Sequence, residues 1–163
     1  MSFHQQLKNK IVGKESARET IAKLHADGKK VVFTNGCFDI IHPGHVDYLS
    51  QARDAGDFLI LGLNTDSSVK KLNKAPNRPI NHESARALVL SGLACIDLIV
   101  FFEEETPLEL ISYLKPDVLV KGNDYAVEKI VGHDVVIANG GKVITIPLLQ
   151  GYSTTNIVNK ILS

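Results

Sequence analysis

Short apolar runs alternate with amphipathic segments along almost the whole chain. Runs that lack a polar residue at every second position are typical of strands covered on both faces. The segments that we expect to form strands are 31–34, 58–63, 96–101, 118–120 and 143–146. The segments that we expect to form helices are 16–26, 43–55, 81–94, 106–115, a stretch ending at 139–141, and the chain from 153 onward. Five strand–helix alternations without an internal repeat or linker predict an α/β fold, in which helices cover both faces of a doubly wound, five-stranded parallel sheet.

Local signals support these boundaries. Thr106, Pro107 and Glu109 form a capping-box pattern with proline at the first helical position. That helix should end before Pro116, because a proline disfavours helical backbone at the residue before it. Residues 67–72 are expected to form a helical turn, and the lysine-bearing stretch that follows is expected to be a loop.

Length and composition limit the number of domains, the charged partners and the location of the protein. At 163 residues, the chain is expected to form one domain, with 1–30 as an N-terminal helical extension and 31–163 as the core. Its 18 basic and 18 acidic residues cancel, so no overall field attracts nucleic acid or an anionic membrane. The N-terminus lacks an apolar signal core and no segment is long enough to span a membrane, so we expect a cytoplasmic protein. Cys37 and Cys95 are expected to be reduced thiols.

The segment 34–45 carries the most informative chemistry. His42 and His45 lie three residues apart at the predicted start of a helix, so their side chains should project from the same side. A helix N-terminus offers free N–H groups and a positive dipole to phosphate, and Gly36 and Gly44 let backbone approach a ligand closely. A single histidine here would ordinarily be a cap or a surface residue. A His-x-x-His pair also resembles part of a metal site, but no further ligand falls into the spacing of a known zinc motif, so no metal site is predicted.

A second motif, 151–157, opens the last helix. Ser153, Thr154 and Thr155 follow Gly151 and could hold phosphate oxygens, although any one of them could be an ordinary helix cap. Four polar motifs follow predicted strands, namely 35–45, 64–66, 121–125 and 151–155. Ligands of doubly wound sheets bind beyond the carboxyl ends of the strands, so these motifs should gather at one edge of the sheet.

The two motifs together resemble the signature of the cytidylyltransferase-like nucleotidyltransferases, whose fold is Rossmann-like. Gly-x-Phe-Asp-x-x-His-x-Gly-His occupies 36–45, and Gly-x-Ser-Thr-Thr-x-Ile occupies 151–157. Within that superfamily the chain is most similar to the D-glycero-β-D-manno-heptose 1-phosphate adenylyltransferases. The segments that carry this similarity are 33–39, 42–49, 62–70, 77–81, 116–125 and 151–155. Asn123 stands where that family usually has glycine, and Leu148 stands where glycerol-phosphate cytidylyltransferases carry arginine.

The resemblance implies that a sugar 1-phosphate attacks the α-phosphorus of ATP, giving an ADP-sugar and pyrophosphate in the synthesis of ADP-heptose for the lipopolysaccharide core. Because no sugar-kinase domain precedes residue 1, we expect the stand-alone form of the enzyme. Mg²⁺ is expected mainly on the ATP phosphates, and a homodimer is possible. The alternatives are a cytidylyltransferase acting on glycerol 3-phosphate or a similar phosphomonoester, and a nucleotide-binding protein without turnover.

The resemblance also implies roles for individual residues. His42 and His45 would be catalytic, donating hydrogen bonds to phosphate oxygens, and 153–155 would hold the β- and γ-phosphates. The residues expected to bind the nucleotide are Asn35, Gly36, Phe38, Gly44, Lys121, Gly122, Asp124, Gly151, Ser153, Thr154 and Thr155. The residues expected to bind the sugar phosphate are Asp39, Asn64, Asp66, Arg78 and Arg86. Asp39 and Asp66 could instead cap or orient backbone, and Arg86 and the lysines of 70–74 could simply face solvent.

Overall fold

A six-stranded parallel sheet forms the centre of the molecule, in the order β1-β4-β3-β2-β5-β6. The computed structural model describes residues 1–73, 77–122 and 126–163. The strands are β1 (Ile11–Val12), β2 (Val31–Gly36), β3 (Phe58–Asn64), β4 (Leu98–Phe102), β5 (Val118–Gly122) and β6 (Lys142–Ile146). The chain first adds strands on one side of β2 and then crosses to β5 on its other side. The strand order therefore reverses between β2 and β5, and a doubly wound sheet binds its ligand at such a point.

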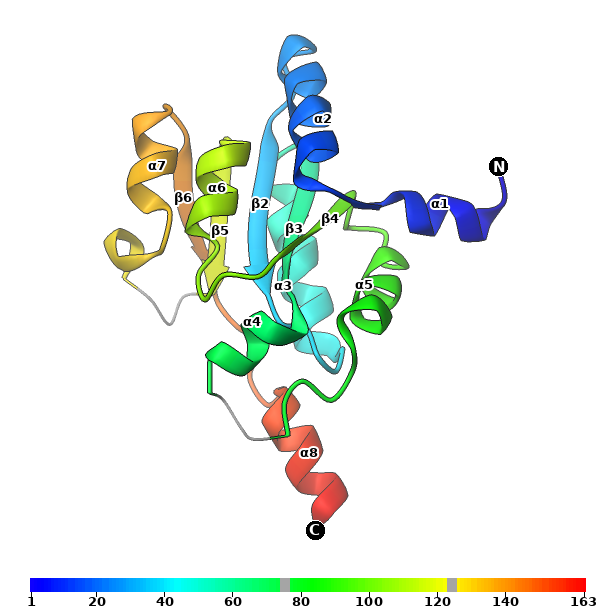
Figure 1. Ribbon diagram of the computed structural model, residues 1–163. Helices are drawn as coiled ribbons and strands as arrows, with labels where there is room; N and C mark the ends of the chain where they lie inside the picture. The colour runs from blue at the N-terminus through cyan, green and yellow to red at the C-terminus, as the bar shows by residue number, and fades with distance from the viewer. Residues whose placement is uncertain (74–76, 123–125) are drawn as a thin grey trace.

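Helices cover both faces of the sheet, as Figure 1 shows. They are α1 (Phe3–Asn9), α2 (Lys14–Ala26), α3 (Pro43–Asp54), α4 (Asp66–Lys71), α5 (Glu83–Ser91), α6 (Leu108–Leu114), α7 (His133–Ala138) and α8 (Thr154–Leu162), with a 3₁₀ turn η1 (Val127–Lys129). Buried side chains of α3 and α5 form one hydrophobic core with the sheet, and those of α2, α6 and α7 form the other. No residue of α8 is buried, and this helix extends beyond the carboxyl ends of the strands (Figure 1).

The strands differ from the sequence prediction in one respect, because the sheet has six strands where five were expected. The additional strand, β1, has two residues and pairs with β4. Two residues are too few to produce a periodic pattern, and the pairing depends on β4, which lies far away in the sequence. Residues 1–30, expected to form an N-terminal helical extension, include α1, β1 and α2. They contribute this edge strand, and the buried Ala17 and Ile21 of α2 pack in one of the two cores.

Two helix starts also differ from the prediction. The helix expected from Asn81 begins at Glu83, with His82 as its N-cap. The capping box at 106–109 is not formed, because α6 begins at Leu108 and its N-cap, Pro107, makes no side-chain hydrogen bond. In the described part of the chain, no helix is both long and apolar enough to cross a membrane.

Candidate active site

A cleft of about 390 Å³ opens at the point where the strand order reverses. Its walls come from the loop after β2, the end of β5 and the start of α8, which are far apart in the sequence. The lining residues are Asn35, Gly36, Cys37, Phe38, Asp39, His42, Gly44, His45, Tyr48, Arg78, Lys121, Gly122, Leu148, Leu149, Tyr152, Ser153, Thr154 and Thr155. The predicted gathering of the motifs is confirmed for 35–45, for Lys121 and Gly122, and for 153–155.

The two histidines form a stacked pair at the start of α3. Their ring centroids are 3.7 Å apart and the rings are inclined by 19°. His42 is the N-cap residue, but its side chain makes no capping hydrogen bond, so a contribution from capping is not expected of it. The Nδ1 atoms of both rings are buried, and neither has a hydrogen-bond partner within the described residues. Buried polar atoms are normally hydrogen-bonded, so this pair is better suited to a ligand than to packing.

Burial favours the neutral form of both imidazoles. Burial, followed by the repulsion that a charged His42 would exert, lowers the pKa of His45 to about 4. Burial also lowers the pKa of His42. Near neutral pH the pair therefore offers uncharged hydrogen-bonding groups to a ligand, and the cations that could neutralise phosphate lie elsewhere in the cleft.

Phe38 holds an uncommon backbone conformation beside the pair. Its φ is +45°, in the left-handed region that residues other than glycine rarely adopt. Its ring lies edge-on to His45 with centroids 5.0 Å apart. A Cβ on Gly36 would come within 2.7 Å of this ring, so the glycine makes room for Phe38. Phe38 is 7% exposed and packs into the core while it also lines the cleft.

The start of α8 forms the opposite wall of the cleft. The hydroxyl of Ser153 accepts a hydrogen bond of 3.0 Å from the backbone N–H of Asn156, so Ser153 is the N-cap of this helix. Gly151 has a φ of +87°, which explains the glycine at this turn. The N-terminal end of α8 therefore points free N–H groups and a positive dipole end toward the cleft that the histidines line.

Asp39 and Arg78 connect the histidine loop to the loop before α5. The buried carboxylate of Asp39 accepts a 2.6 Å hydrogen bond from Nε of Arg78, and two further bonds from the backbone N–H groups of Ile80 and Asn81. Of the two roles considered for Asp39, the structure therefore shows backbone orientation. Arg78 itself lines the cleft with 13% of its side chain exposed.

Asp66 and Arg86 form an ion pair away from this cleft, and neither residue lines the smaller cavity described below. Arg86 has no exposed side-chain surface, and one of its terminal nitrogens donates a 2.8 Å bond to Asp66. Burial alone would raise the pKa of Asp66, but the bonds from Arg86 and His82 outweigh it and lower the pKa. The structure thus does not bring these two predicted substrate residues to the cleft, because each satisfies the charge of the other.

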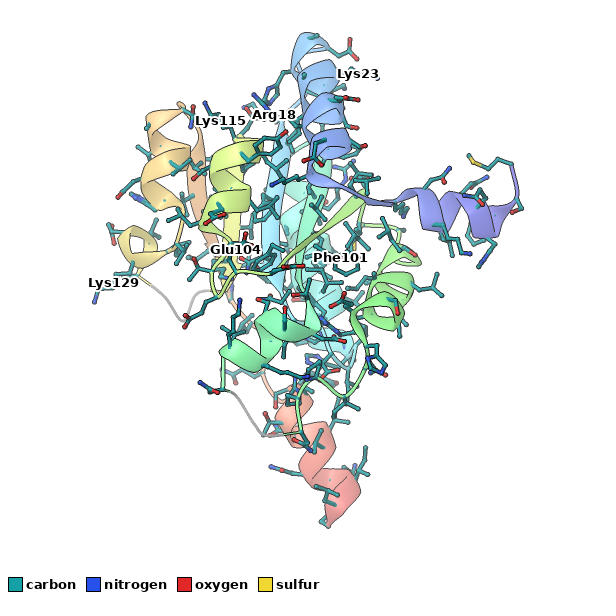
Figure 2. All side chains as sticks on the ribbon, in the orientation of Figure 1. Arg18, Lys23, Phe101, Glu104, Lys115 and Lys129 are labelled. Carbon is teal, nitrogen blue, oxygen red and sulfur yellow. The ribbon has the colours of Figure 1, made fainter. Side chains whose placement is uncertain are left out.

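A smaller cavity, of about 250 Å³, adjoins the cleft. The two cavities share Asn35, Gly36, Cys37 and Lys121 as walls. Across this shared wall, Nζ of Lys121 donates a 2.8 Å hydrogen bond to Asn35. The far side of the smaller cavity is formed by Asn64, Leu72, Glu105, Thr106, Pro107, Leu119, Lys129, Ile130 and Val131. The exposed side chain of Lys129 is labelled in Figure 2.

Some lining residues had not been singled out from the sequence. Tyr48, Leu149 and Tyr152 line the larger cleft, and Thr106 and Lys129 line the smaller cavity. Tyrosine and leucine are common in any core, and a single threonine or lysine is common on any surface, so these residue types alone carried no signal. Asp124, which was expected to bind the nucleotide, lies outside the described residues.

The fold and the cleft together define an α/β domain suited to binding the phosphates of a nucleotide. The chain belongs to the cytidylyltransferase-like family, whose family model matches residues 33–160. It is 57% identical to the bifunctional protein HldE of Caulobacter vibrioides over 91% of this chain and 31% of that protein. It is 53% identical to the bifunctional protein HldE of Trichlorobacter lovleyi over 98% of this chain and 32% of that protein. The chain thus spans about a third of the length of these curated relatives.

Two solved structures are also similar. A lipopolysaccharide core biosynthesis protein from Thermoplasma volcanium has a TM-score of 0.61 and 26% identity, and the match covers 77% of this chain and 100% of that one. A pantoate–β-alanine ligase from Francisella tularensis has a TM-score of 0.61 and 16% identity, over 93% of this chain and 77% of that one. At that identity, the ligase supports the fold alone.

Proposed function

We propose that this protein transfers an adenylyl group from ATP to a sugar 1-phosphate, with D-glycero-β-D-manno-heptose 1-phosphate as the acceptor, giving ADP-heptose and pyrophosphate. The observation that carries the proposal is the cleft in which the stacked histidines face the start of α8. The similarity to bifunctional proteins named HldE and to a lipopolysaccharide core biosynthesis protein supports the acceptor class.

The reaction needs alignment more than proton transfer. A phosphate oxygen of the sugar attacks the α-phosphorus of ATP, and the bond from that phosphorus to the bridging oxygen of pyrophosphate breaks. The attacking oxygen is already anionic near pH 7, so no general base is required. Catalysis then depends on holding the reactants in line and stabilising the charge that grows on the phosphate oxygens.

We assign the triphosphate to the larger cleft. His42 and His45 would donate hydrogen bonds to the oxygens around the α-phosphorus. The first N–H groups of α8, together with Thr154 and Thr155, would hold the outer phosphates, as helix N-termini commonly do. Arg78 lines this cleft, and its guanidinium, whose Nε is bound by Asp39, would donate hydrogen bonds to the phosphates from its terminal nitrogens.

We assign the acceptor to the smaller cavity. In-line attack requires the nucleophile to enter opposite the leaving pyrophosphate, and the smaller cavity meets the cleft across the wall formed by Asn35, Gly36 and Lys121. Its polar residues suit a phosphorylated sugar: Lys129 at the rim is cationic, and Glu105 and Thr106 can bond hydroxyl groups.

We place Mg²⁺ on the phosphates of ATP. Among residues 1–73, 77–122 and 126–163, no three His, Cys, Asp or Glu side chains gather as metal ligands. The carboxylate of Asp39, in the cleft wall, already accepts three hydrogen bonds. The described residues therefore do not fit a protein cage for the ion, whereas Mg²⁺ commonly binds through substrate phosphates.

A pyrophosphate-release assay tests the proposal. The protein is given ATP or CTP, each with heptose 1-phosphate, a hexose 1-phosphate or glycerol 3-phosphate. We expect the highest kcat/KM with ATP and heptose 1-phosphate. A higher kcat/KM with CTP and glycerol 3-phosphate would establish the cytidylyltransferase alternative, and nucleotide binding without turnover on any acceptor would establish a binding protein.

A further inference from the structure

Arg86 lies behind the active-site wall, and its bonding pattern gives it a role other than substrate binding. Its guanidinium makes three hydrogen bonds, each to a different segment. One terminal nitrogen donates to the carbonyl of Cys37 at 2.7 Å, the other donates to Asp66 at 2.8 Å, and Nε donates to the carbonyl of Asn81 at 3.0 Å. A planar guanidinium can bond three acceptors in fixed directions at once, which an ammonium group cannot do.

The hydrogen bond from Arg86 to the carbonyl of Cys37 restrains the backbone at the next residue, Phe38. Phe38 is held in the left-handed region, and such a conformation persists only where its surroundings determine it. The carbonyl of Cys37, in the peptide group before Phe38, accepts from Arg86, and the carbonyl of Asp39, one residue after Phe38, accepts from the side-chain amide of Asn81 at 2.7 Å. The peptide group before Phe38 and the carbonyl of the residue after it are therefore both held by partners from one segment, 81–86.

Phe38 in turn contacts the histidine pair. Its ring lies edge-on to His45, which stacks on His42. His45 therefore contacts two other aromatic rings, and one of them, that of Phe38, belongs to a residue whose backbone is in the left-handed region. Displacing Phe38 would remove one of the two ring contacts of His45 and leave only the stack on His42.

We infer that Arg86 is a positioning residue, which holds Phe38 in its left-handed conformation and through the Phe38 ring sets the orientation of His45. Arg86 is not among the lining residues of either cavity, and its side chain has no exposed surface. The kinetic part of this inference rests on the proposed function. The structural part, the link from Arg86 to His45, does not.

The test compares Arg86→Lys with a matched control. Lysine keeps the charge opposite Asp66 but cannot also bond Cys37 and Asn81 in the same geometry. The control is Arg53→Lys, because Arg53 also pairs with an aspartate, Asp97, at 2.9 Å and also donates to a backbone carbonyl, that of Gly56, at 2.7 Å. Arg53 lies at the end of α3 remote from the histidines, so its variant reports the loss of stability alone.

We expect Arg86→Lys to lower kcat about ten- to hundredfold with little change in the KM for ATP, as misplaced catalytic groups do. NMR of labelled histidine and phenylalanine should show the nuclear Overhauser contacts between Phe38 and His45 weakened, along with the ring-current shift of the His45 protons. Arg53→Lys should leave kcat and these signals unchanged. Normal kcat in folded Arg86→Lys, or intact Phe38–His45 contacts with reduced kcat, would overturn the inference.

Phe38→Leu provides a second route if Arg86→Lys does not fold. It removes the ring while leaving Arg86 in place, and it should reproduce the loss of kcat. Combining it with Arg86→Lys should cost little more, because both changes break the same link. A Phe38→Leu protein with normal kcat would overturn the inference. If wild-type protein releases no pyrophosphate on any acceptor, the proposed function fails, whereas the NMR comparison still decides the structural link.

Discussion

The imidazole rings of His42 and His45 stack at a centroid distance of 3.7 Å. Two protonated rings at this distance would repel one another, so the stack is stable only while at least one ring is neutral. A helix N-terminus adds positive potential and disfavours protonation further. The cleft thus combines neutral donors with a positive helix dipole, an arrangement that suits an anionic ligand.

Replacing His45 with alanine tests whether this histidine has a catalytic role or only a structural one. We expect His45→Ala to lower the single-turnover rate about 10²–10³-fold, on the order of 3–4 kcal/mol, if the imidazole stabilises the transition state. ATP affinity should change little. Thermal unfolding recorded in parallel monitors the fold, and His4→Ala, at an exposed site in α1, serves as the control. A normal chemical step in folded His45→Ala protein would remove His45 from catalysis.

The lowered pKa of His45 predicts a dependence of stability on pH. Below pH 6.5 the unfolded chain binds a proton at His45, whereas the folded protein does not until the pH nears about 4. The unfolded state therefore holds more protons in this window, so the free energy of unfolding should fall as pH is lowered from about 6.5 to about 4. Because the ring is only partly buried, we expect this loss to be on the order of 2 kcal/mol, and to stop once both states are protonated.

Chemical denaturation at several pH values measures this effect. His45→Asn should show a weaker loss of stability than wild type between pH 6.5 and 4, because the asparagine does not titrate. An equal acid-induced loss in the two proteins would assign the effect to other groups.

Asp39→Asn should disturb both stability and nucleotide binding. The carboxylate accepts three hydrogen bonds, and an amide offers one oxygen and two donors in its place. Breaking a buried ion pair typically costs about 3–5 kcal/mol. Because Arg78 would lose the carboxylate that holds its Nε, the KM for ATP should rise about tenfold or more.

Asp57→Asn is the control, since Asp57 also accepts a hydrogen bond from a backbone N–H, that of Lys30, at the amino ends of the strands. Unchanged ATP kinetics in folded Asp39→Asn protein would contradict the role assigned to Arg78.

Ser153→Asp distinguishes phosphate binding from helix capping. Aspartate caps a helix about as well as serine, so α8 should remain folded. Its negative charge would repel the outer phosphates, and we expect the KM for ATP to rise about tenfold or more. Ser2→Asp makes the same change at the N-cap of α1, where Ser2 accepts a bond from Gln5, and should leave the kinetics unchanged. Equal kinetics in the two variants would show that Ser153 acts as a cap alone.

Much of the fold could be predicted, because most of its strands follow from apolar runs within single segments of the sequence. Each of the five expected strands is present, and the long apolar runs place them to within about two residues. Edge strand β1 was missed, and so was α1, because their short segments are held by partners distant in the sequence. The capping box was wrong for a related reason: the pattern at 106–109 is compatible with capping, but the chain enters α6 through Pro107 instead.

Residue types and spacing determined by themselves that two histidines would share one side of a helix start, and that a Ser-Thr-Thr motif would open another helix. That the two ends gather at one edge of the sheet was also predicted from the sequence, but the strand order, and with it the position of the cleft between β2 and β5, is established only by the folded sheet. The tertiary structure likewise decided which of the charged side chains line the cleft and which do not. Arg78 lines the cleft, whereas Arg86, eight positions later, is buried against Asp66. Sequence gives the charge of a side chain, but its role depends on which carboxylates and carbonyls the fold brings within hydrogen-bonding distance.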